Sequence, residues 1–182
     1  MSQPEVPQKL LVVSFDDPLR AQEFLLAAAR LQKQNDLQVH DAVFVRRDAD
    51  GSTHVTETTD LTPGRGALGA GIWGLLLGTL LAGPWGLVVG AASAGTGALV
   101  AKLRDTGIKD EKIAELRRTV RPGRTALALL VSHVSVADLQ KELARFPGAS
   151  LVETDLPPAA VVAVSHALDE ANRAPFTDVP PA

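Results

Sequence analysis

The feature that most constrains this chain is a 36-residue segment, Gly66 to Ala101, that contains ten glycines and no charged residue. Gly83-Pro84 lies near its middle, and a proline there removes a backbone donor and breaks or turns a helix. The halves on either side would each be about 26 Å long as helices, close to the roughly 30 Å thickness of a bilayer core. The segment therefore predicts a helical hairpin, either inserted in a membrane, which is our first expectation, or buried in a soluble oligomer.

Small residues recur at every fourth position in both halves of this segment. Positions four apart lie on one face of a helix, so each half presents a smooth groove of the kind that lets membrane helices approach closely. Each glycine weakens an isolated helix in water by about 1 kcal/mol relative to alanine, so the hairpin needs neighbours. We therefore expect a homo-oligomer. The residues predicted to mediate helix–helix association are Ala70, Gly74, Gly78, Ala82, Gly86, Gly90, Ala94 and Ala98.

The start of the segment also has the glycine spacing G-x-x-G-x-G, in GALGAG, which could suggest a phosphate-binding loop. A P-loop needs a Lys-Ser/Thr pair after its glycines, and this stretch has none. A dinucleotide-binding fold needs a preceding strand and an acidic residue about 20 positions later, and both are missing. We reject this interpretation and expect no cofactor.

Outside the segment, hydrophobic periodicity predicts one α+β domain. Asp17 is expected to cap a helix over residues 18–34, with Pro18 in its first position. The turn DADG is expected to join two strands of a hairpin. Asp110 and Ser135 are expected to cap two further helices, and a terminal helix is expected after Pro158. The expected strands cover residues 9–15, 37–47, 52–58, 125–132 and 149–154. We predict a ferredoxin-like antiparallel sheet with helices, carrying the Gly-rich hairpin as an insert.

These elements divide the chain into four parts. The divisions are a disordered lead-in over 1–8, one α+β domain made of 9–62 and 105–156, the inserted hairpin over 63–104, and a terminal helix with a disordered tail over 157–182.

Both faces of the expected sheet are apolar. In the first strand, Leu11 and Val13 point to one face while Leu10 and Val12 point to the other. Helices on one side would leave the second face open. It is then covered either by the terminal helix or by a second copy that stacks its sheet there.

Composition excludes several classes of function. A net charge of −3 with no basic stripe argues against a nucleic-acid binder. The absence of cysteine excludes disulfides, thiolate metal sites and a cysteine nucleophile, and it fits a reducing compartment. No Ser-His-Asp order, carboxylate pair or metal-ligand spacing stands out, so we expect no catalytic residue, no metal and no enzyme. The scattered histidines are His40, His54, His133 and His166.

Asp41 and a group of arginines are the charged features that need an explanation. Asp41 shares a predicted strand face with Val39 and Val43, so its carboxyl group is expected to be buried and either paired or protonated. A structural role, bonding backbone donors near a helix start, is the expectation. The arginines, which either complement a helix end or meet anionic lipid headgroups, are Arg117, Arg118, Arg121 and Arg124.

Three stretches carry a resemblance to a known family. They are HDAVFVRRDADG at 40–51, GIKD at 107–110 and ELRRTVRPGRTALALLV at 115–131. They are similar to the bacterial family of uncharacterised proteins named domain of unknown function 1269, whose members are commonly described as predicted membrane proteins with a Gly-rich hairpin in mid-sequence. The resemblance covers about Lys9 to Thr154. It implies this organisation and a membrane location, but no activity, since none is established for the family.

Together these features predict a non-enzymatic, self-associating bacterial protein. Its hairpin, flanked by Arg65, Lys102 and Arg104, would sit in the inner membrane with the α+β domain in the cytoplasm. The expected partners are a second copy of the chain and the lipid bilayer. The alternative is a cytoplasmic, soluble homo-oligomeric scaffold protein whose hairpins pack at the centre of the assembly.

Overall fold

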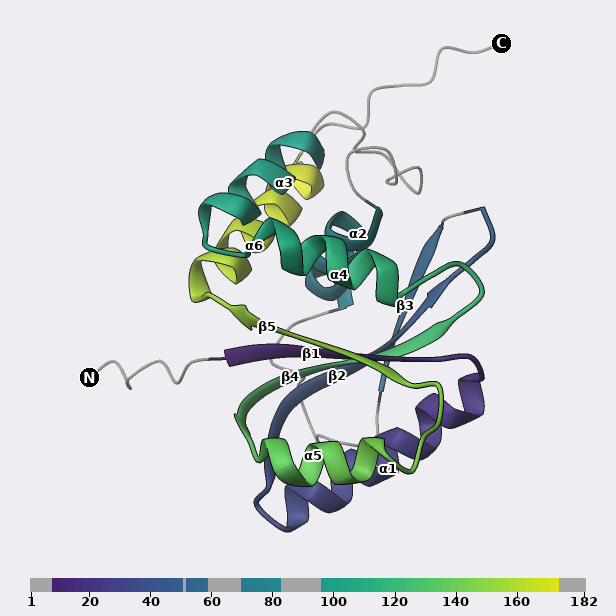
Figure 1. The fold of residues 1–182 in the computed structure, drawn as a ribbon. Coiled ribbons are helices and arrows are strands. Elements are labelled where there is room, and N and C mark those ends of the chain that lie inside the picture. The colour runs from purple at the N-terminus through teal and green to yellow at the C-terminus, as the bar shows by residue number, and fades with distance from the viewer. Residues whose placement is uncertain (1–7, 51, 59–69, 83–95, 174–182) are drawn as a thin grey trace, which may run out of the picture.

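The computed structural model describes residues 8–50, 52–58, 70–82 and 96–173, and these form an α+β fold around a five-stranded antiparallel sheet (Figure 1). The strand order is β3-β2-β4-β1-β5. The predicted α+β class is confirmed, while the finer ferredoxin-like topology stays a prediction. In chain order the elements are β1 (Gln8–Phe15), α1 (Pro18–Lys33), β2 (Leu37–Arg47), β3 (Thr53–Glu57), α2 (Ala70–Ala82), α3 (Thr96–Asp105), α4 (Asp110–Thr119), β4 (Thr125–Val134), α5 (Val136–Leu143), β5 (Ser150–Leu156) and α6 (Pro158–Arg173).

Local chemistry explains where several helices begin. Asp17 caps α1 as predicted, because its Oδ1 accepts a hydrogen bond from the backbone N–H of Leu19 at 2.9 Å. The start of α4 differs by one position from the prediction. Lys109 occupies the N-cap, and Asp110 lies in the first turn, where it pairs with Arg104 at 2.6 Å. A carboxylate there still complements the positive end of the helix.

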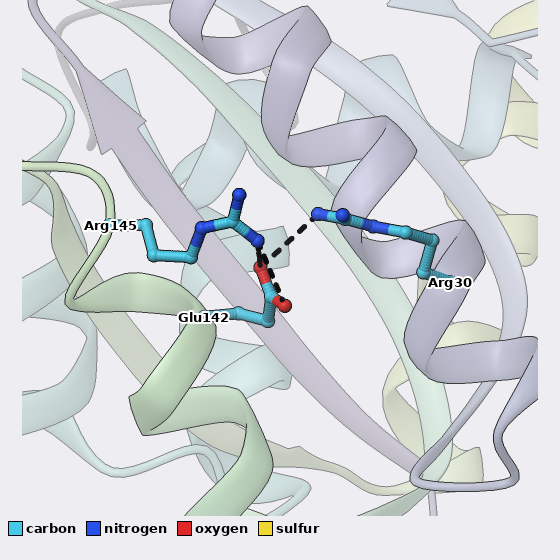
Figure 2. A network of polar contacts seen from close by, with 3 residues as sticks. All are labelled: Arg30, Glu142 and Arg145. Carbon is cyan, nitrogen blue, oxygen red and sulfur yellow. Dashed lines mark hydrogen bonds and ion pairs between the residues drawn. The ribbon is translucent and has the colours of Figure 1, made fainter.

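Helices α1 and α5 cover one face of the sheet (Figure 1). Their core contains three phenylalanine rings, Phe15, Phe24 and Phe146, whose centroids lie 5.3–5.8 Å apart in tilted and edge-on arrangements. At the surface, Glu142 on α5 accepts hydrogen bonds from Arg30 on α1 at 3.3 Å and from Arg145 at 3.2 Å (Figure 2). These contacts join the two helices into one layer.

Helices α2, α4 and α6 cover the opposite face of the sheet, with α3 beside them (Figure 1). Leu10 and Val12 of β1 are buried there against Trp73 of α2 and Leu116 of α4. The apolar second face therefore has a cover from the same chain. The terminal helix α6 forms part of this cover, which was one of our two expectations. Helices α2 and α4 form the rest of it.

An irregularity in β2 changes which residues face which side. The register between β2 and β4 shifts around Val39 and Asp41. As a result Leu37 and Val39 pack on the α1 side, while Val43 packs on the α2 side. Our expectation that Asp41 and Val39 share a face was wrong, because a bulge inserts an extra residue and reverses the alternation of side chains.

The expectation of a transmembrane hairpin was wrong. Among the described residues, no helix combines the length and the apolar character needed to cross a bilayer. Helix α2 has 13 residues and is therefore about 20 Å long, well short of the roughly 30 Å core. The physical reason lies in its packing. Most of its large apolar residues are almost fully buried within the fold itself: Trp73, Leu76, Leu77, Leu80 and Leu81.

Several expectations concern parts of the chain outside the described residues. These are the Gly83-Pro84 break, most of the disordered lead-in and the tail beyond Arg173. The limits of the insert, 63–104, therefore stay a prediction. Within the described part, α2 shares one hydrophobic core with the sheet and contacts β3, α3, α4 and α6.

Candidate functional site

The predicted helix-association residues are only partly within the described structure. Ala70, Gly74, Gly78 and Ala82 lie on α2, and Ala98 lies on α3. Gly78 is buried. The remaining three, Gly86, Gly90 and Ala94, lie outside the described residues. Helices α2 and α3 contact each other, yet a role of these small residues in joining two copies stays a prediction.

A buried polar contact fixes α2 to the sheet. The carboxyl group of Asp41, which is 5% exposed, accepts a hydrogen bond from the indole N–H of Trp73 at 2.8 Å. Its other oxygen accepts one from the backbone N–H of Ala42, also at 2.8 Å. Asp41 therefore has a structural role, as expected, but its main partner differs from the one we expected. We expected backbone donors at a helix start, and the structure provides a side chain on the glycine-rich helix.

Arg117 makes a second polar link, between α4 and α2. Its Nε–H donates to the backbone oxygen of Leu80, in the last turn of α2, at 2.8 Å. Carbonyl groups at a helix C-terminus lack partners within the helix and carry partial negative charge, so a guanidinium stabilises them. Burial lowers the pKa of Arg117 below its ordinary value, and the nearby charges of Arg104 and Arg47 lower it further, against a smaller opposite effect of Asp110.

A narrow crevice lies beside this link. It lies between α2, α3 and α4, it is too narrow for a water molecule, and it is lined by Thr79, Leu80, Leu103, Ile113 and Arg117. Three of the lining residues are aliphatic, so the polar groups of the other two face an apolar surrounding. In such a surrounding an ionic interaction is stronger than in water.

The arginines that we grouped from the sequence lie at different places in the fold. Arg117 enters the crevice, whereas Arg118, one position further along α4, is exposed. Arg124 lies elsewhere, where it pairs with Asp16 at 2.7 Å and donates to the backbone oxygen of Gly148 at 2.9 Å. These arginines therefore do not form one basic patch.

The histidines are also separated. His54 lies opposite Arg46 in the β2–β3 hairpin and contacts Asp48 at 2.9 Å, so His40 is not its partner. His40 Nε2 lies 2.7 Å from the hydroxyl oxygen of Ser132. Among the described residues, no group of three or more His, Asp or Glu side chains could hold a metal ion.

Sequence reasoning missed two residues of this region, Trp73 and Thr79. We assigned Trp73 to the hydrophobic hairpin and did not consider its indole N–H. The signal was available, because a buried tryptophan N–H needs an acceptor and Asp41 was already expected to need a donor. Thr79 offers a similar signal, since it is the one hydroxyl residue within α2.

Comparison with known proteins gives a family but no activity. No match was found among curated proteins or among solved structures. The family described as "Protein of unknown function (DUF1269)" matches residues 67–169, more than half of the chain, from the start of the glycine-rich segment to most of α6. The match includes α2, α4 and the crevice between them. The chain therefore belongs to the DUF1269 family.

Proposed function

We propose that the protein is a non-enzymatic structural protein that acts as a homo-oligomer. The observation that carries this proposal is an apolar stripe on the outer face of α1. Leu19 is 64% exposed and Leu26 is 65% exposed. They lie seven positions apart, which places them on one face of the helix. Val136 on α5, in the same layer, is 54% exposed. Exposed apolar side chains on one layer of a protein favour contact with another protein.

The stripe is suited to contact with a second copy of itself. Two α1 helices that pack antiparallel, with the two-fold axis midway between Leu26 and Ala27, bring Glu23 of one copy near Arg30 of the other, because both positions are equally far from that axis. A two-fold interface of this kind uses the same patch on both copies. Both side chains are exposed, with 58% and 54% of their area accessible.

We place the contact between copies on α1 rather than on the hairpin. Most of the apolar side chains of α2 are already buried in the core of their own chain, so they have little surface left to offer. We also propose a cytoplasmic location. It is supported by the absence of cysteine, which fits a reducing compartment.

The experiment is a mass measurement by light scattering on the purified full-length chain without detergent. We expect a defined oligomer, and we expect Leu26→Glu to reduce its mass, since it places a charge in the centre of the interface. The matched control is Val162→Glu on α6, which has a similarly exposed aliphatic side chain on the other layer (54%) and should leave the mass unchanged. A wild-type monomer at all concentrations would contradict the proposal.

A further inference from the structure

Buried polar atoms without partners gather at one end of α4. Among the described residues, four buried side-chain atoms have no hydrogen-bond partner: Arg47 Nε, Thr53 Oγ1, Thr79 Oγ1 and Arg117 Nη2. Buried polar groups are nearly always hydrogen-bonded, and leaving one unpaired is costly. Each such atom therefore needs an explanation.

These four atoms come from two pairs of neighbouring residues. Thr79 and Arg117 line the same crevice. Arg47 and Thr53 are partners across the β2–β3 ladder. Arg47 reaches the end of α4, where its Nη1 donates to the backbone oxygen of Val120 at 3.4 Å. Figure 1 shows the C-terminal end of α4 pointing toward the β2–β3 hairpin. The charge of Arg47 also acts on Arg117, so the two guanidinium groups lie within electrostatic reach of each other.

The positive charge of this region is only partly balanced. Asp110, the nearby carboxylate, is engaged by Arg104 at 2.6 Å. No ion pair joins Arg117 or Arg47 to a carboxylate in the part of the chain that the structure describes. An arginine stays protonated at neutral pH, so a partly buried guanidinium without a counter-ion favours binding of an anion.

We propose that the crevice between α2 and α4 binds a phosphate group, which accepts hydrogen bonds from the Arg117 guanidinium and the Thr79 hydroxyl, while Arg47 adds positive charge. The planar fork of arginine matches two phosphate oxygens, and a hydroxyl supplies a further donor. Thr79 lines the crevice, and its hydroxyl is fully buried without a partner, so it offers the site a donor. The aliphatic lining strengthens the attraction between the charges.

Binding requires a small movement. The crevice is too narrow for a water molecule as it stands, so solvent does not satisfy these donors from within. Arg117 is half-buried, and rotation of its long side chain toward solvent would open the space. The phosphate would then enter beside Thr79.

The test is thermal unfolding of the full-length chain with increasing inorganic phosphate, compared with sodium chloride at equal ionic strength. We expect a saturable rise in Tm with phosphate, because a ligand that binds the folded state stabilises it. Arg117→Gln should weaken the apparent Kd by about tenfold or more, since it loses a charge-assisted hydrogen bond. The matched control is Arg118→Gln, an exposed arginine on the same helix, which should respond as the wild type does.

Thr79→Val keeps the test decisive if Arg117→Gln fails to fold. Valine matches threonine in shape but has no unpaired hydroxyl, so Tm without phosphate should rise while the response to phosphate falls. No saturable rise in wild type, or unchanged responses in Thr79→Val and Arg117→Gln, would overturn the proposal. A stronger response to glycerol 3-phosphate than to inorganic phosphate would identify a phosphate monoester as the source. An equal response to acetate would overturn the assignment to phosphate.

Discussion

Replacing Asp41 with alanine tests the link between the glycine-rich helix and the sheet. The change leaves the indole N–H of Trp73 and the backbone N–H of Ala42 without the acceptor that each has at 2.8 Å. An unsatisfied buried donor costs about 1–3 kcal/mol, so the two together predict a loss of about 2–6 kcal/mol in the free energy of unfolding. Small domains have about 5–15 kcal/mol in total, so this loss is large.

The assay is urea unfolding followed by circular dichroism, with Trp73→Phe and the double variant completing a cycle. Because Trp73→Phe removes the same hydrogen bond, the two changes should be non-additive by about 1–3 kcal/mol. The matched control is Asp155→Ala, an exposed aspartate on β5, which should change the free energy by less than about 0.5 kcal/mol. A loss below about 1 kcal/mol for Asp41→Ala, or strictly additive effects, would refute the reasoning.

Three further predictions follow from other parts of the fold. Leu76→Ala, at a fully buried position of α2, should destabilise the protein by about 2–5 kcal/mol in urea unfolding, whereas a helix outside the core would tolerate it. Gly148→Ala should lower Tm, costing about 1–2 kcal/mol, because Gly148 has φ +81° and the added Cβ would lie 3.3 Å from Asp16 Oδ2; an unchanged Tm contradicts this. The hydrogen bond to Glu153 raises the pKa of Lys9 above 10.5, so this pair stabilises the fold below about pH 10.5 and loses its effect as pH rises through the folded pKa. Both side chains are partly exposed, so Lys9→Met should lower the free energy of unfolding by less than about 1 kcal/mol. The matching difference in Tm, measured from pH 8 to about 12, should disappear as the pH rises through the folded pKa of Lys9.

The sequence predicted the regular elements of the α+β fold well because their signals are local. Asp17-Pro18 marked the start of α1, and the apolar runs of β1 and β4 marked two neighbouring strands. The apolar character of both sheet faces also correctly indicated a second covering layer. In each case a short stretch of residues carries the information, through capping, backbone restriction or alternation.

What covers the glycine-rich segment could not be predicted from local signals in the same way. Apolar residues on all sides of a helix predict burial, but they do not say whether lipid, a second copy or the same chain provides the cover. The deciding contact joins Trp73 to Asp41, which lie 32 positions apart. The bulge that turns Asp41 toward α2 depends on how β2 aligns with β4, and this alignment is not visible in the sequence of either strand.

The candidate site illustrates the same limit. The arginines of α4 were visible in the sequence, but their separation was not. Arg117 and Arg118 differ by one position, which is about 100° around a helix, and this difference puts one in the crevice and the other in solvent. Thr79 becomes a candidate site residue only because Arg117 lines the same crevice.

The most direct test of the central claim, that α2 is a buried part of the chain's own fold, is hydrogen exchange of the Trp73 indole N–H, measured by NMR on the full-length chain without detergent. The Trp73→Phe variant assigns the signal. The account predicts slow exchange, limited by opening of the core, and faster exchange in Asp41→Ala. Exchange at the rate of a free indole in the wild-type protein would contradict it.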